Sequence, residues 1–285
     1  MEQIVERYYN REFLSAIGIS RQRLYKMRQL KVKARLKQQG VLKEVKQVRS
    51  RHKNMSARMI HSMLESPEVG INKFERIASE HGLSVPRKKK RIVTTISDPS
   101  LWDRNLINGL EINDICQVIA GDITYYEDYY IFTLKDMYSK RIVGLYGSDN
   151  MRSFNAIQAL KQVIRLRGAT LATCIHHTDA GSQYKSEAYG KYLKRYRLQM
   201  SISNNCLENG MAEQLNGVLK NDYLPEGIPS VGQLNKELKR IKRLINYERP
   251  VKALGKRSPV EYEEYIAKLP SDKRTKIKLY DFTKD

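Results

Sequence analysis

Three carboxylates between residues 122 and 213 occupy positions at which the residue type calls for a physical explanation. Asp122 interrupts the apolar run QVIAGDITYY, although strand interiors are depleted in Asp because an unpaired buried carboxylate is costly. Asp179 ends the run TCIHHT and is followed by Ala-Gly-Ser, a sequence typical of a turn. Glu213 lies within CLENGMAEQLNGVLK, which has the periodicity of a helix.

Taken singly, these residues have ordinary explanations, because an Asp often starts a turn and a helical Glu usually faces solvent. Together, two carboxylates on strands and one on a helix form the kind of oxygen ligand set that Mg²⁺ prefers. Two such ions about 4 Å apart stabilise the attacking and the leaving oxygen in phosphoryl transfer. The three carboxylates therefore suggest metal-dependent chemistry on a phosphodiester.

Composition indicates a polyanionic partner. The chain of 285 residues has a formal net charge of +21, which favours nucleic acid over an anionic membrane surface. Most of this excess lies in residues 1–95. Three cysteines far apart argue against a disulfide framework or a cysteine-rich zinc site. No apolar run approaches the length of a membrane span, so we expect a cytoplasmic protein without a membrane partner.

Residues 110–225 read as an α/β domain. Three β-rich runs in a row predict an antiparallel meander, and residues 153–168 predict a helix with Ser153 as its cap and a buried stripe. A further strand near 171–177, a helix at 185–196, a strand near 198–202 and a helix after Cys206 complete a mixed sheet flanked by helices. Residues 226–285 are expected to form a C-terminal helical extension and tail. The predicted stripe is Phe154, Ile157, Leu160 and Ile164.

The N-terminal part reads as helical DNA-binding modules. Within residues 1–44, EFLSAIGISRQRLYKMRQ has the rhythm of a helix-turn-helix, with Gly18 in the turn and Ser20 as an N-cap. The second helix would present Arg21, Arg23 and Lys26 to DNA. An ordinary helical hairpin with a solvated basic face explains the pattern equally well.

A second small helical module is predicted at 45–86, where Ser56 can cap one helix and Asn72 with Glu75 can form a capping box for the next. A basic linker follows at 87–109. It could contact phosphates or be a solvated arm. Its unbroken basic run is Arg87, Lys88, Lys89, Lys90 and Arg91.

Five blocks of the sequence, in order, resemble the integrase core of bacterial insertion-sequence transposases of the OrfB type, which belong to the DDE superfamily with retroviral integrases. The blocks are GDITYY, KDMYSKRIVGLY, HHTDAGSQYKS, CLENGMAEQLNGVLK and YERPVKALGKRSPVEY. The resemblance implies an RNase H-like catalytic domain with a mixed five-stranded sheet. It makes Asp122, Asp179 and Glu213 the catalytic residues and metal ligands, with two Mg²⁺ or Mn²⁺ ions per active site. The interval from Asp179 to Glu213 is slightly shorter than is usual in that family.

Four neighbours of these carboxylates are candidates for DNA contact. His177 precedes Asp179 by two residues and matches the family's histidine, although a packed strand histidine is the commoner outcome. Asn216 and Lys220 share a helix face with Glu213 at steps of three and four, and Arg249 matches a C-terminal family block. For Lys220, a solvated helix position is an equal alternative.

These observations predict a DNA transposase that cleaves and joins the strands of an insertion element. Its partners would be the terminal repeats and the target DNA, and it would act as a homodimer or larger assembly near the nucleoid. The sequence leaves open whether a second element-encoded protein is needed. Two alternatives remain at this stage: a catalytically inactive DNA-binding regulator derived from a transposase, and an RNase H-like nuclease without strand transfer.

Overall fold

The structure, a computed structural model, describes residues 18–279 apart from 66, 86–104, 180 and 204–209, and the side chains of 210–213 are also outside this description. The chain divides into two compact units. We call Met1–Ser50 with Met55–Pro86 the N-terminal unit, and Arg51–Asn54 with Arg87–Asp285 the core unit. Each unit is described by itself.

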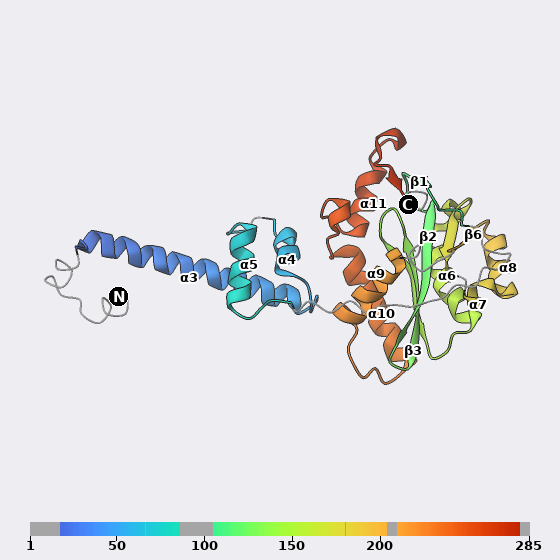
Figure 1. Ribbon diagram of the computed structural model, residues 1–285, viewed down its shortest axis with the longest axis horizontal. Coiled ribbons are helices and arrows are strands. Elements are labelled where there is room, and N and C mark those ends of the chain that lie inside the picture. Colours follow the sequence, from blue (N-terminus) through green and yellow to red (C-terminus); the bar gives the residue numbers. More distant parts are fainter. Residues whose placement is uncertain (1–17, 66, 86–104, 180, 204–209, 280–285) are drawn as a thin grey trace, which may run out of the picture. The chain divides into compact units, whose positions relative to one another are not determined.

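The N-terminal unit begins, in its described part, with the long helix α3, Arg21–Arg49 (Figure 1). Gly18 has a φ of 65°, and the Ser20 hydroxyl accepts a hydrogen bond from the N–H of Arg23 at 3.2 Å. The predicted turn and cap are therefore confirmed, while the helix predicted before Gly18 lies outside the described residues. Because α3 runs through the predicted boundary between residues 44 and 45, the two predicted N-terminal modules share one helix.

Two short helices, α4 (Ala57–Met63) and α5 (Ile71–Glu80), pack on the last turns of α3. Ser56 caps α4 as predicted, its hydroxyl accepting from the N–H of Met59. The predicted capping box at Asn72 and Glu75 is wrong, because α5 starts directly after Gly70 and Glu75 pairs with Arg58 instead. The small core of this unit includes Val41, Val45, Ile60, Phe74 and Ile77.

The core unit is built on a five-stranded mixed sheet with the order β4-β3-β2-β5-β6. Strands β2, β3 and β4 form an antiparallel meander, whereas β5 and β6 run parallel to β2. Each parallel strand is reached through helical connections, as a parallel pairing requires. The strands are β2 (Val118–Tyr126), β3 (Tyr129–Asp136), β4 (Ile142–Ser148), β5 (Ile175–Thr178) and β6 (Gln199–Ile202).

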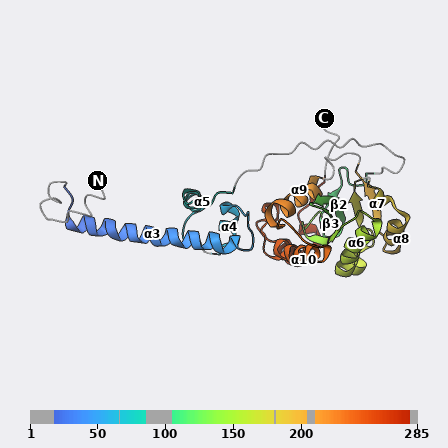
Figure 2. The same ribbon diagram turned by 90° about the horizontal axis from the view of Figure 1, so that it is seen from below.

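Helices cover both faces of this sheet, as Figures 1 and 2 show. On one face, α6 (Ser153–Arg167), α7 (Ser182–Lys185) and α8 (Glu187–Arg195) bury a core with apolar side chains of β2, β3 and β4. On the other face lie α9 (Gly210–Val218), a π-helical turn (Leu219–Tyr223) and α10 (Val231–Tyr247). A sheet with a hydrophobic core on each face matches the predicted α/β domain.

Helix α6 differs in two details from its prediction. Its N-cap is Arg152, which makes no side-chain capping bond, so Ser153 is not the cap. Phe154 is 60 % exposed, whereas Ile157 and Leu160 are buried. The buried face combines Ile157 and Leu160 with the small residues Ala156 and Ala159. Gly144 of β4 lets the helix lie close to the sheet, because a Cβ there would come within 2.6 Å of the Ala159 carbonyl oxygen.

The C-terminal residues are part of the core unit. Helix α11 (Pro259–Ala267) starts at a complete capping box between Ser258 and Glu261, and a short strand β7 (Ile277–Lys278) pairs antiparallel with β1 (Glu111–Ile112). Tyr262 and Ile266 of α11 join a third core with the start of β2. Short 3₁₀ turns lie at Gly168–Leu171, Lys252–Leu254 and Ser271–Lys273. Within the described residues, no helix is both long and apolar enough to cross a membrane.

Candidate active site

The sheet brings Asp122 and Asp179 to neighbouring positions on adjacent strands. Ala120 of β2 lies opposite His177 of β5 in parallel register, and two further steps along both strands place Asp122 beside Asp179. Adjacent strands lie about 4.8 Å apart. On the opposite face of β2, Gly121 lets the side chains of Leu134 and His176 pack tightly, because a Cβ there would come within 2.9 Å and 3.0 Å of them. The sheet thus supplies two carboxylates at one point.

Backbone N–H groups orient both carboxylates. Oδ1 of Asp122 accepts a hydrogen bond from the N–H of Ile123 at 2.9 Å, and Oδ1 of Asp179 accepts one from the N–H of Gly181 at 3.3 Å. Burial raises the pKa of Asp179, while the Gly181 N–H and the charge of Lys185 act in the opposite direction. A buried carboxylate that is costly to ionise gains most from a bound cation.

Helix α9 is tied to Asp122 through Asn216. Its Nδ2 donates to Oδ2 of Asp122 at 2.5 Å. The hydroxyl of Thr133, whose residue pairs with Asp122 across β2 and β3, donates to the Asp122 carbonyl at 3.1 Å and lies 3.4 Å from Oδ1 of Asn216. Asp122 therefore faces α9, and Asn216 fixes both the carboxylate and the helix.

Glu213 lies on α9 three residues before Asn216. Residues three apart share one face of a helix, so the backbone places Glu213 on the side of α9 that meets β2. Its side chain is outside the described part of the chain. Among the described side chains, no group of three His, Cys, Asp or Glu residues lies close enough to hold a metal ion.

We expect Asn216→Ala to lower metal-dependent DNA cleavage by about 10- to 100-fold, because residues that orient metal ligands typically carry that much of the affinity or activity. The loss should appear as a raised Mn²⁺ concentration for half-maximal activity. Gln214→Ala, an exposed change on the same helix, is the matched control. Equal metal dependence of wild type and Asn216→Ala would show that the Asn216–Asp122 bond has no functional role.

His177, a predicted DNA contact, is fully buried. Its Nδ1 lies 2.9 Å from the Ser201 hydroxyl. Its neighbour His176 is also buried and contacts the Tyr189 hydroxyl at 2.8 Å through Nε2. Burial lowers the pKa of each histidine to about 4. The structure favours the packed-histidine alternative, and the predicted DNA contact of His177 stays a prediction.

These histidines predict that the free energy of unfolding falls in acid. Their pKa values are about 4 in the folded chain and 6.5 as the reference for an unfolded one, so the unfolded state takes up protons first as the pH drops below 6.5. Each histidine should remove on the order of 2 kcal/mol by pH 5. Urea unfolding between pH 7 and 5 measures this. His176→Gln should show a shallower loss than wild type or the exposed control His81→Gln, and an unchanged slope would contradict the argument.

The other predicted DNA contacts occupy varied positions. Arg21, Arg23 and Lys26 are exposed on α3, and Lys220 is half-buried on the π-helical turn that follows α9. Arg249 is engaged inside the core unit, where its guanidinium bonds Asp222 at 3.0 Å and the Tyr223 hydroxyl at 3.1 Å. Asn216 bonds Asp122, as described above. The run Arg87, Lys88, Lys89, Lys90 and Arg91 lies outside the described residues.

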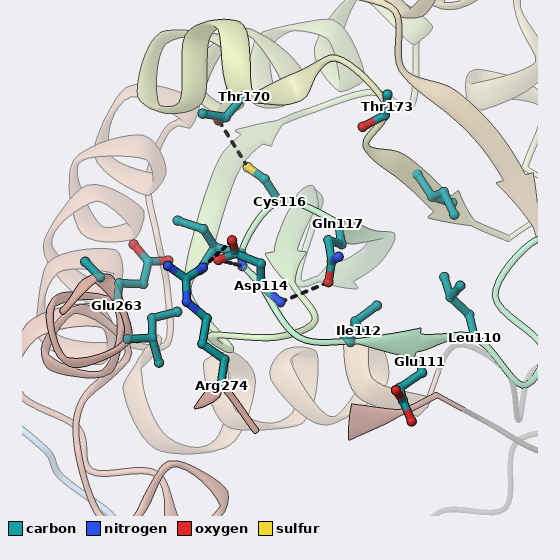
Figure 3. Close-up of a pocket in the computed structure, with 14 residues that line it drawn as sticks. Leu110, Glu111, Ile112, Asp114, Cys116, Gln117, Thr170, Thr173, Glu263 and Arg274 are labelled. Carbon is teal, nitrogen blue, oxygen red and sulfur yellow. Dashed lines mark hydrogen bonds and ion pairs between the residues drawn. The ribbon is translucent and has the colours of Figure 1, made fainter. Parts of the chain in front are cut away.

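A separate pocket of about 580 Å³ opens where β2 and β5 begin, at the opposite ends of these strands from Asp179 (Figure 3). Its polar groups are bonded to one another: Asp114 pairs with Arg274, and Oε1 of Gln117 accepts from the N–H of Asp114 at 2.9 Å. The Thr170 hydroxyl lies 3.8 Å from the Cys116 sulfur. The Asp114–Arg274 pair joins the segment after α11 to the segment before β2, and the pocket does not contain the candidate site.

The strand order, the antiparallel meander and the two parallel strands define an RNase H-like core, with its candidate carboxylates on adjacent central strands. Residues 116–205 match the family model described as the integrase core domain. This segment includes both Asp122 and Asp179.

Two curated relatives are insertion-element proteins. A Mycobacterium tuberculosis protein ascribed to insertion sequence element IS986/IS6110 as its transposase is 28 % identical over 213 residues, which cover 70 % of this chain and 77 % of the relative. The transposase for insertion sequence element IS629 of Shigella sonnei is 29 % identical over 178 residues, or 59 % of this chain and 60 % of the relative.

Among solved structures, the chain is similar to the simian T-cell lymphotropic virus intasome, with a TM-score of 0.45, 16 % identity, and coverage of 71 % of this chain and 70 % of that one. The HTLV-2 integrase catalytic core domain in complex with magnesium has a TM-score of 0.40 and 18 % identity, covering 56 % of this chain and 99 % of that one.

Residues 116–205 thus form an integrase core domain, and the curated relatives of this chain are transposases of bacterial insertion sequences. The family predicted from the sequence is thereby confirmed.

Proposed function

We propose that this protein is a DNA transposase that cleaves and joins DNA strands, with Asp122, Asp179 and Glu213 as its metal-binding residues. The single observation that carries the assignment of the site is the pairing register of β2 and β5, which sets Asp122 beside Asp179 inside the matched integrase core. Carboxylate oxygens are the donors that Mg²⁺ or Mn²⁺ prefers. The donor set therefore fits hard divalent cations, and we propose two per active site.

Hydrogen bonds from neighbouring residues fix the orientation of the carboxylates that would bind metal. When bound, divalent cations would activate the attacking oxygen and stabilise the leaving oxygen of a phosphodiester. Asn216 and the N–H of Ile123 hold the two oxygens of Asp122 in one orientation, and the N–H of Gly181 orients Asp179. Asp179 is half-buried, and its partial removal from water strengthens electrostatic interactions at the site. The attacking group is water or a DNA 3′-hydroxyl, so no protein nucleophile is required.

The basic N-terminal unit would bind the terminal repeats of the element, using Arg21, Arg23 and Lys26 of α3. Joining two DNA ends calls for at least two active sites, so we propose that the protein acts as a dimer or larger assembly on DNA. The relatives described as a trimeric or dimeric integrase core and as an intasome act in assemblies, in line with this proposal.

A cellular transposition assay tests this function. A marker flanked by the element ends should move to a second plasmid when wild-type protein is expressed, and should stay in place with Asp179→Asn. Movement with both proteins would contradict the assigned site. Broken donor plasmids without insertions would instead indicate a nuclease without strand transfer, and repression without breakage would indicate a regulator.

A further inference from the structure

The face of the core unit formed by α6, α7 and α8 carries an aromatic side chain that the fold does not use. Phe154 is 60 % exposed, and Met151 nearby is 44 % exposed. Ile157 and Leu160 fill the core beneath α6. Phe154 therefore contributes little to folding, although it is the kind of large apolar residue that is usually buried.

The surroundings of Phe154 are basic. Nζ of Lys161 lies 5.9 Å from the ring centroid of Phe154 and 5.9 Å from that of Tyr192 on α8. Arg152, the N-cap of α6, is exposed, and so is Lys185 on α7, the helix that packs against α6. We call the following residues the α6–α8 patch: Met151, Arg152, Phe154, Lys161, Lys185 and Tyr192.

The charge of this segment identifies the kind of partner. Residues 151–197 contain nine Lys and Arg residues but only two acidic ones. Of the two acids, Asp179 is at the candidate site, and Glu187 is paired with Lys191 at 2.7 Å. A basic surface with interleaved aromatic rings is typical of binding to nucleic acid strands, because bases stack on the rings while phosphates meet the cations.

The patch lies at the same end of the sheet as the candidate site. Strands β4 and β2 are both antiparallel to β3, so they end on the same side, and α6 starts just after β4. Helix α7 begins three residues after Asp179 and packs against both α6 and α8. Figures 1 and 2 show these three helices together on one side of the sheet. Asp122 faces α9, on the other face of the sheet, so a DNA strand must pass over this end of the sheet to run from the candidate site to the patch.

We propose that the α6–α8 patch binds target DNA, with Phe154 stacked against a base at an unstacked, kinked step and phosphates held by Arg152, Lys161 and Lys185. Stacking and phosphate contacts carry little sequence information, which suits a target more than the defined ends of an element. This inference rests on the proposed function. A second copy of the chain is a poorer occupant, because two such basic surfaces repel each other.

Strand-transfer kinetics test the patch. With a pre-cleaved element end and unrelated target DNA, Phe154→Ala should lower joining about tenfold, whereas cleavage of the element end should change less than about twofold. Phe154→Trp should retain joining, because tryptophan also stacks. The control is Leu166→Ala, which removes a 41 % exposed apolar side chain at the other end of α6. Equal joining by wild type and Phe154→Ala would overturn the proposal.

Photo-crosslinking gives a second readout that needs no catalysis. Unrelated single-stranded DNA containing 5-iodouracil should crosslink within residues 151–161 of the full chain, and Phe154→Ala should abolish that adduct. Crosslinking there by a protein without transposase activity would support the patch while contradicting the proposed function. Crosslinks confined to other segments would overturn the proposal. If Phe154→Ala changed the oligomeric state of the protein but not its adducts, Phe154 would belong to an interface between copies of the chain instead.

Discussion

Asp179→Asn should lower DNA cleavage and joining by about 10³-fold or more, and Asp122→Asn should do the same. Metal ions contribute several kcal/mol of charge stabilisation in phosphoryl transfer, and each 1.4 kcal/mol is worth about tenfold in rate. An amide keeps the shape of the carboxylate but loses the charge that binds the metal. Rates on labelled element-end DNA in Mg²⁺ and in Mn²⁺ measure the effect.

The same substitution should leave the metal-free fold intact or make it slightly more stable. Burial raises the pKa of Asp179, so its charge destabilises the folded state in a way that the neutral amide would not. The melting temperature without metal should therefore equal or exceed that of wild type, and the rise in melting temperature on adding Mn²⁺ should disappear. An inactive variant that also melts well below wild type would mean that Asp179 supports the fold and not the chemistry.

Glu263→Gln should destabilise the core unit by about 3–5 kcal/mol, because it removes one partner of a buried ion network and leaves cationic groups uncompensated. Glu263 on α11 pairs with Arg167 of α6 and with Arg141, and it accepts a bond from the Ser139 hydroxyl at 2.7 Å. Asp136 is fully buried beside them and accepts backbone N–H bonds. Burial alone would raise the pKa of Glu263, but the hydrogen bond and the charge of Arg167 bring this pKa below its usual value.

Urea unfolding at neutral pH measures this loss. The matched control is Glu187→Gln, which breaks an exposed pair with Lys191 and should change the free energy of unfolding by less than about 1 kcal/mol. Similar small effects for both variants would show that the network contributes little, and that α11 is held to the sheet by its apolar contacts alone.

Much of the core unit could be predicted because its signals are local. Runs rich in apolar, β-branched and aromatic residues predict strands β2 to β4, and a carboxylate within such a run is unusual. The resemblance predicts that Asp122 and Asp179 lie close together. Which residue of β2 lies opposite which residue of β5, however, is a property of the folded sheet. Register depends on packing between strands, and no single run of sequence contains it.

The parts that could not be predicted depend on tertiary contacts. Asn216 has the right helical spacing from Glu213, yet its bond to Asp122 exists only because α9 crosses β2. Glu75 has the spacing of a capping residue, but its carboxylate pairs with Arg58 of the neighbouring helix. Phe154 fits the apolar stripe of α6, yet its side chain is exposed while Ile157 and Leu160 are buried in the core. In each case a partner distant in sequence decides the outcome.

The most direct test of the account is strand cleavage and joining by the purified full chain on labelled element-end DNA, with Mg²⁺, with Mn²⁺ and with EDTA. Cleaved and joined products are expected from wild type only when a divalent metal is present, and none are expected from Asp179→Asn under any condition. Products in EDTA, or equal products from the variant, would contradict metal-dependent catalysis at the Asp122–Asp179 site.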